Sequence, residues 1–193
     1  LKKELSIVRH KHLSAKTPQT KAKYRKEDMR LRNEIAELLI EDDWNDVNAH
    51  KLSGWDPYDQ KSSSDYFDPE WMLGVKSGFS IVIGNPPYIQ LQKDLNDGTN
   101  TKHGDLYINS GYETFERTGD IYCLFYEKGL NLLKEKGLLT YITSNKWMRA
   151  GYGEKLRQFF TKFNPLILID LGPGVFESAV DTNVLVIQKS ENR

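Results

Sequence analysis

Four short apolar runs, with helical segments between them, limit the folds that this chain can adopt. The runs cover roughly residues 80–83, 138–143, 166–171 and 183–188. Their length and their β-branched side chains indicate buried strands. Helical periodicity appears over 120–136 and 153–163. Strands that alternate with helices predict an α/β domain with a mostly parallel sheet. We expect the last strand to be antiparallel, because the link before it is too short for a crossover helix.

The N-terminal part has a different character. Residues 1–17 are polar, and from Leu1 to Lys26 there are nine Lys or Arg residues against one Glu. This basic stretch is either a solvated, partly disordered arm or an arm that contacts phosphates. A helix is predicted from about 19 to 41, and 42–70 reads as a loop with aromatic anchors. We therefore divide the chain into a basic arm and helix at 1–52 and a catalytic part at 53–193.

Composition narrows the class of protein. The chain has 193 residues, of which 28% are charged and 38% hydrophobic, values that indicate a globular domain. No apolar run approaches the roughly 20 residues of a membrane span. The single cysteine, Cys123, excludes an internal disulfide and a cysteine-based zinc site, and no metal site is predicted. A cytoplasmic location is expected. Because the chain begins with Leu1 and not Met, we expect it to be part of a longer protein.

The segment Gly84-Asn85-Pro86-Pro87-Tyr88 is the strongest candidate for chemistry, because it directly follows a predicted strand. Ligands of open α/β sheets bind at the carboxyl ends of strands. The Asn85 side-chain carbonyl and the Pro86 backbone carbonyl can accept two hydrogen bonds from one amine, which favours positive charge on its nitrogen. The prolines restrict the backbone, and Tyr88 offers a ring on which a flipped base can stack. The alternative is a plain strand-to-loop turn, since Asn-Pro often begins turns.

The Asn-Pro-Pro-Tyr tetrapeptide resembles the motif of class I methyltransferases that act on planar nitrogens. The surroundings resemble type IIG restriction–modification enzymes, in which an adenine methyltransferase and a nuclease share one polypeptide. The segments that carry this resemblance are Trp55-Asp56-Pro57-Tyr58-Asp59-Gln60, Phe67-Asp68-Pro69-Glu70-Trp71-Met72, Thr118-Gly119-Asp120-Ile121-Tyr122 and Ser144-Asn145-Lys146-Trp147-Met148.

The resemblance implies part of a class I, Rossmann-like mixed sheet with an antiparallel last strand and an N-terminal helical extension. It also implies a DNA N6-adenine methyltransferase that uses S-adenosylmethionine, binds double-stranded DNA and flips the target adenine out of the duplex.

The same resemblance assigns roles to single residues. Asn85, Pro86, Pro87 and Tyr88 hold the adenine. Phe176 stacks on the other face of the base, although it can also be an ordinary core residue.

Asp120 and Tyr122 belong to the cofactor-side wall, and Asp120 can equally cap the following helix. Lys146 and Trp147 either contact DNA or cover the pocket.

Other expected parts are missing from the sequence. No Gly-rich turn follows an apolar strand before Gly84, and no nuclease-like cluster is evident. We expect the main cofactor loop upstream and a target-recognition region downstream in the same polypeptide. The isolated chain is expected to be inactive and to bind S-adenosylmethionine weakly or not at all.

Two other functions stay open. A protein-glutamine methyltransferase can carry the same tetrapeptide, but it does not need the long polar loop at 89–119. A degenerate methyltransferase fold used as a binding module would lack cofactor binding, which a titration of the full-length protein would reveal.

Overall fold

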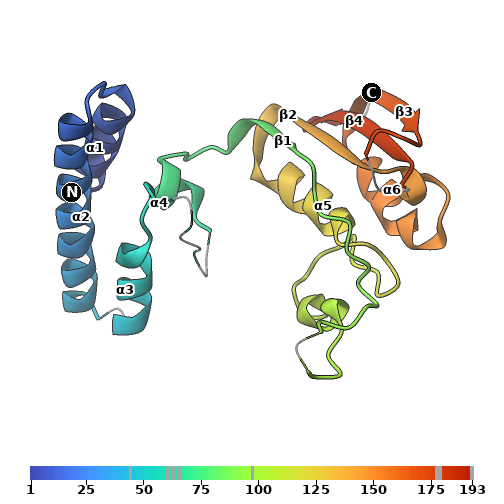
Figure 1. Ribbon diagram of the computed structural model, residues 1–193, viewed down its shortest axis with the longest axis horizontal. Coiled ribbons are helices and arrows are strands. Elements are labelled where there is room, and N and C mark those ends of the chain that lie inside the picture. The colour runs from blue at the N-terminus through green and yellow to red at the C-terminus, as the bar shows by residue number, and fades with distance from the viewer. Residues whose placement is uncertain are drawn as a thin grey trace. The chain divides into compact units, whose positions relative to one another are not determined.

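The computed structural model describes residues 1–43, 45–59, 61, 64, 67–96, 98–176 and 180–191. It contains two compact units, Leu1–Lys76 and Ser77–Arg193, which we call unit 1 and unit 2 (Figure 1). The sequence suggested a division at 52/53 instead. The segment after residue 52 goes with unit 1 because it is hydrogen-bonded to the N-terminal helices, as described below.

Unit 1 is helical, with α1 at Lys2–Ser14, α2 at Pro18–Glu41, α3 at Asp46–Gly54 and α4 at Pro69–Leu73. The helix expected near 19–41 is confirmed. The interpretation of the first residues as a partly disordered arm is wrong, because α1 buries Leu5 in a cluster with Leu31 and Ile35 of α2. The loop predicted for 42–70 is also wrong at α3, whose first turn is capped by the Asn45 side chain.

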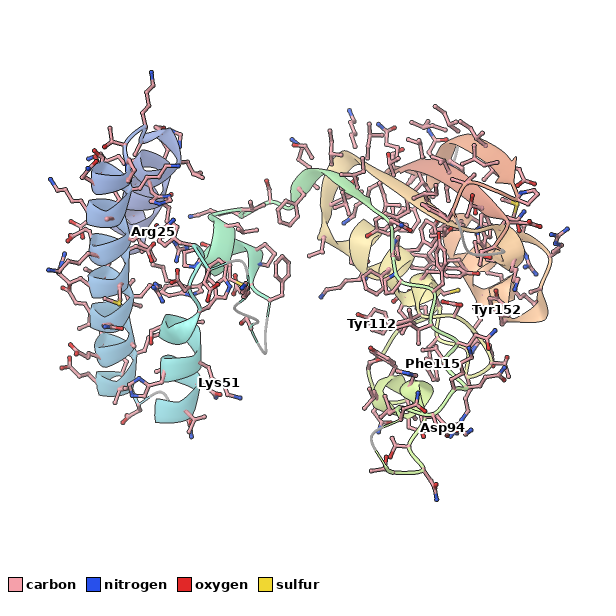
Figure 2. The ribbon with its side chains drawn as sticks, viewed as in Figure 1. Arg25, Lys51, Asp94, Tyr112, Phe115 and Tyr152 are labelled. Atoms are coloured by element: carbon pink, nitrogen blue, oxygen red, sulfur yellow. The ribbon has the colours of Figure 1, made fainter. Side chains whose placement is uncertain are left out.

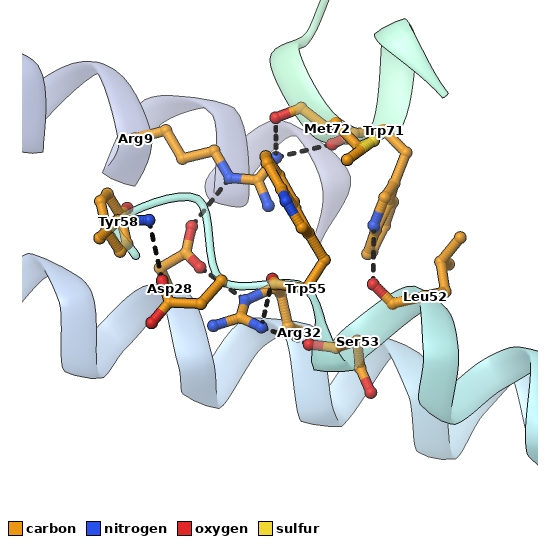
Figure 3. Close-up of polar contacts among 10 residues, drawn as sticks. Arg9, Asp28, Arg32, Leu52, Ser53, Trp55, Tyr58, Trp71 and Met72 are labelled. Atoms are coloured by element: carbon orange, nitrogen blue, oxygen red, sulfur yellow. Dashed lines mark hydrogen bonds and ion pairs between the residues drawn. The ribbon is translucent and has the colours of Figure 1, made fainter. Parts of the chain in front are cut away.

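A buried charge network holds unit 1 together (Figure 3). The fully buried Asp28 carboxylate accepts hydrogen bonds from Arg9 Nε at 2.8 Å and Arg32 Nε at 2.7 Å. Arg9 also donates to the Trp71 and Met72 carbonyls, and Arg32 to those of Ser53 and Trp55. A buried carboxylate is tolerated only when it is paired in this way. The network ties residues beyond 52 to both long helices.

Within the described residues, unit 2 contains a four-stranded sheet of order β1-β2-β4-β3. The strands are β1 at Phe79–Gly84, β2 at Leu133–Ser144, β3 at Asn164–Gly172 and β4 at Thr182–Gln188. β1 and β2 are parallel, whereas β4 is antiparallel to both β2 and β3. The predicted α/β class and antiparallel last strand are therefore confirmed.

The helix predicted for 120–136 is shorter, with α5 at Tyr122–Leu132. β2 begins directly after it, five residues earlier than the apolar run at 138 suggested. The early part of the strand is polar, but Lys136 N donates to Lys189 O and Lys189 N donates to Gly137 O. These backbone hydrogen bonds stabilise an extended strand at this point in place of a longer helix.

Helices α5 and α6, the latter at Glu154–Phe160, contribute to a core on one face of the sheet. Tyr126 and Leu130 of α5, Leu156 of α6 and Leu139 of β2 are almost fully buried there. Other aliphatic side chains of the sheet are exposed to solvent: Ile81 is 60% exposed and Ile83 is 77% exposed. Among the described residues, no helix is long and apolar enough to cross a membrane.

Candidate active site

The loop after β1 lies at the carboxyl end of a strand that runs parallel to β2, so the loops after both strands emerge at the same edge of the sheet. Asn85 and Pro87 are exposed, Pro86 is buried and Tyr88 is half-buried. The Tyr88 hydroxyl donates to Asn85 Oδ1 at 3.2 Å. The loop thus contains a side-chain amide, two proline backbone carbonyls and an aromatic ring within four residues.

Asp120 anchors the end of this loop. Its Oδ1 accepts the Ile89 backbone N–H at 3.0 Å, and the Ile121 N–H donates to the Ile89 carbonyl at 2.9 Å. Burial raises the pKa of the Asp120 carboxyl, while hydrogen bonds from the backbone N–H groups of Tyr122, Ile89 and Ile121 oppose that shift. Asp120, predicted to belong to the cofactor-side wall or to cap a helix, is therefore hydrogen-bonded to the backbone of Ile89, directly after Tyr88.

Two further tyrosines support the Tyr88 ring. Tyr88 meets Tyr122 edge to face, with ring centroids 6.2 Å apart and an interplanar angle of 87°. Tyr122 is fully buried, and its hydroxyl pairs with that of Tyr152 at 2.8 Å. Tyr152 comes from the short turn before α6 (Figure 2). Burial, and then the nearby Asp120 carboxylate, raise the pKa of Tyr88, so its hydroxyl stays protonated and can donate.

A pocket of about 170 Å³ opens beside this loop. Its lining includes Tyr88, Asp120, Ser144, Lys146, Tyr152 and Val180. The lining combines side chains that follow β1 with side chains that follow β2. A small planar group that entered the pocket would meet the Tyr88 ring, a carboxylate and an ammonium group.

The two residues expected at the end of β2 have different surroundings. Lys146 is exposed and lines the pocket. Trp147 is 6% exposed, its indole N–H donates to Asn183 Oδ1 at 3.1 Å, and its ring packs against Phe160 at 5.3 Å. Trp147 is thus a core residue that does not line the pocket, whereas the exposed Lys146 can meet a ligand there.

Of the remaining predicted residues, Tyr122 has no exposed surface with which to touch a cofactor. Phe176 is 36% exposed and is not among the residues that line the pocket. Its contact with a base stays a prediction, and residues 177–179, which follow it, lie outside the described residues.

The sequence reading missed Tyr152 and the turn that carries it. Gly153 explains this turn, because a Cβ atom there would collide with the Trp147 backbone carbonyl. Arg157 donates to that carbonyl at 2.6 Å and to the Ala150 carbonyl at 3.1 Å. A Gly-Tyr-Gly triplet ahead of an amphipathic helix was the available signal, but its spacing carries no specific chemistry.

Known proteins resemble this chain in sequence. It is 33% identical over 119 residues to the type II restriction enzyme and methyltransferase RM.Eco57I of Escherichia coli, an alignment that covers 59% of this chain and 11% of that protein. It is 25% identical over 140 residues to the adenine-specific methyltransferase PglX of Lacticaseibacillus casei, covering 66% of this chain and 11% of PglX. The chain therefore spans about a tenth of the length of these relatives.

A solved structure of the ATP-dependent type ISP restriction-modification enzyme LlaBIII bound to DNA aligns with 70% of this chain and 11% of that one, at 15% identity and a TM-score of 0.47. The family model named Eco57I restriction-modification methylase matches residues 2–176, which is most of the chain and extends over unit 1 and the greater part of unit 2. On that match, the chain belongs to the Eco57I restriction-modification methylase family.

Proposed function

We propose that this chain forms the acceptor side of the active site of a DNA N6-adenine methyltransferase of the type IIG kind. The observation that carries the proposal is the Asn85–Tyr88 loop, which Asp120 holds at the carboxyl edge of the sheet and whose Tyr88 ring lines the pocket. The names of the relatives, one of them adenine-specific, support the choice of substrate.

The loop suits the chemistry of an exocyclic amine. The amine is a poor nucleophile because its lone pair is delocalised into the ring. Acceptance of both N–H groups, by Asn85 Oδ1 and the Pro86 carbonyl, stabilises positive charge as the nitrogen gains a methyl group. In the structure, the Tyr88 hydroxyl occupies Asn85 Oδ1. An incoming amine would replace the Tyr88 hydroxyl as the donor to Asn85 Oδ1. The Tyr88 ring would then stack on the base.

The methyl donor in this proposal is S-adenosylmethionine, which supplies an electrophilic methyl group. The described residues do not fit a complete site for it. Tyr122 is fully buried, and Asp120 Oδ1 is already bonded to the Ile89 N–H. We therefore assign binding of the donor to other residues of the full-length protein, and to this chain only the handling of the amine.

The test is methylation of unmethylated plasmid DNA by the full-length protein with isotope-labelled S-adenosylmethionine. After digestion to nucleosides, we expect the label in N6-methyladenine. Label found in cytosine, or in glutamine side chains of added protein with none in the DNA, would contradict the proposal. A Lys128→Gln variant is a matched control, because this exposed residue lies on α5 and does not line the pocket.

A further inference from the structure

We propose that the tip of the α1–α2 hairpin, in unit 1, is a contact surface for the phosphates of duplex DNA. This inference rests on the proposed function only for its choice of DNA as the partner. The surface, which we call the cationic tip, consists of the exposed residues Lys11, Lys16, Lys21, Lys23, Arg25 and Lys26. It has no acidic neighbours in sequence, because no Asp or Glu occurs between Glu4 and Glu27.

The hairpin geometry brings these cations together. α1 ends at Ser14 and α2 begins at Pro18, so the two helices are joined by a short turn (Figure 1). Arg25 Nε donates to His12 Nε2 at 3.2 Å, which fixes the register of the helices near the turn. Lys16 lies in the turn, and Lys21 follows within the first turns of α2. The positive charge is therefore concentrated at one end of the hairpin.

The described residues do not neutralise this charge. No ion pair forms at Lys16, Lys21 or Lys26 among them, whereas Arg30, further along α2, is paired with both Glu27 and Glu34. Burial, followed by the charges of Arg25 and Lys21, lowers the pKa of His12 at the base of the tip. The hairpin thus keeps a positive field that its own acids do not cancel.

The charges on α2 also oppose its macrodipole. A helix is stabilised by acids in its first turn and cations in its last turn, by about 0.3–1 kcal/mol each. α2 has neither: no acid lies in its first turn and no base in its last, which instead contains Glu41. Lys21 lies in the first turn, at the positive end of the helix, where a cation costs stability. A contact with an external anion explains why such an arrangement would be retained.

The composition of the tip favours DNA over other anionic partners. A protein interface needs an apolar, well-packed centre, and Leu13 is the one large apolar side chain exposed between Lys11 and Lys26 in the described residues. Contacts with DNA phosphates need only cations spread along a surface, because the duplex carries one charge per about 1.7 Å of axis. Such contacts position a protein on DNA without reading its sequence.

The experiment compares two triple variants of the full-length protein. Lys16→Gln, Lys21→Gln and Lys26→Gln remove charge from the tip, and Lys128→Gln, Lys134→Gln and Lys136→Gln remove three exposed charges from unit 2. Binding to a duplex of arbitrary sequence is followed by fluorescence anisotropy over a range of KCl concentrations. Each lost phosphate contact reduces the slope of log affinity against log salt by about 0.9.

We expect the tip variant to bind more weakly, with a slope reduced by about 2–3, and the unit 2 variant to match the wild type. Thermal unfolding of the tip variant should be unchanged or shifted upwards, because it loses cations near the positive end of α2. A tip variant with the wild-type slope and affinity would overturn the proposal. Binding of the same variant to phosphatidylserine vesicles and to an acidic peptide is measured in parallel. A tip variant that loses binding to the vesicles or the peptide but binds the duplex as the wild type does would also overturn the proposal. Failure of the proposed function is separate, since it appears as DNA binding without N6-methyladenine.

Discussion

The loops after β1 and β2 begin at the same edge of the sheet but have opposite environments. After β1, Asn85 and Pro87 are exposed, and the loop is held mainly through its backbone. After β2, Asn145 and Trp147 are each 6% exposed, and their side chains are bound inside the unit. The loop after β1 leaves Asn85 and Pro87 exposed, whereas the loop after β2 buries Asn145 and Trp147 and leaves Lys146 exposed at the pocket. Position at a sheet edge therefore does not by itself identify a residue that contacts substrate.

The contrast is strongest within one dipeptide. Lys146 is exposed and lines the pocket, whereas Trp147 packs against Phe160 and Tyr126. If this division is correct, substitutions at the two positions should affect different properties of the protein.

The largest effect on stability is expected from Trp147→Ala. Removal of a buried aromatic side chain costs about 3–5 kcal/mol, and the change also leaves the buried Asn183 Oδ1 with fewer donors. Urea denaturation should show this loss for Trp147→Ala and almost none for Lys146→Ala, its exposed neighbour. Equal stabilities of the two variants would show that the loop after β2 is not a scaffold.

A smaller effect is expected from Tyr88→Ala, and it should appear as weaker retention of the flipped base. Loss of a stacking ring weakens retention of a flipped base by about 1–3 kcal/mol. A fluorescent adenine analogue at the target position would report this loss in the full-length protein. Tyr88→Phe is the matched control. It keeps the ring and removes only the hydroxyl that occupies Asn85 Oδ1, so it should be nearly silent. A Phe variant as impaired as the Ala variant would point to a role for the hydroxyl instead.

The smallest effect concerns the anchor of the β1 loop. Asp120→Ala deprives the Ile89 N–H of its acceptor and should destabilise the loop by about 1 kcal/mol, detectable as faster amide exchange at Ile89. Asp120→Asn keeps an acceptor and should preserve the loop.

The Asn variant also allows a test of the raised pKa of Asp120. A carboxyl whose pKa is higher in the folded state favours folding most when it is protonated. The stability of the wild type relative to Asp120→Asn should therefore fall as the pH rises from about 4 towards 7. A difference that is flat, or that rises with pH, would contradict the burial of this carboxyl.

Much of the fold followed from local patterns. The apolar runs at 80–83 and 183–188 fall within β1 and β4, and the short link before β4 correctly predicted its antiparallel direction. The predictions failed where tertiary contacts overrode local composition. Residues 2–14 look like a solvated arm, but Leu5 is buried in a cluster with residues of α2, and the partly buried Arg9 pairs with Asp28 of α2. Residues 133–137 look like the end of a helix, but hydrogen bonds with Lys189 make them a strand.

In the candidate site, as in the fold, local patterns were predictable and long-range contacts were not. Asn85-Pro86-Pro87-Tyr88 stands out because its residue types restrict the backbone and supply acceptors, which local sequence can reveal. The anchor at Asp120 joins residues 31 positions apart, and the Tyr122–Tyr152 pair joins residues 30 apart. Contacts of this range depend on the packing of α5 against the sheet, so no local pattern specifies them. Trp147 shows the opposite error, since its place in a family-like segment suggested a residue that contacts DNA or covers the pocket, whereas its side chain is buried in the core.

The most direct test of the account is single-turnover methylation by Asn85→Ala in the full-length protein. Asn85 is exposed, so its removal should leave stability and DNA binding close to those of the wild type. Loss of an acceptor that acts as the amine becomes positive should slow the chemical step by about 10²–10³-fold, or about 3 kcal/mol. A single-turnover rate equal to that of the wild type would show that the Asn85–Tyr88 loop does not hold the amine.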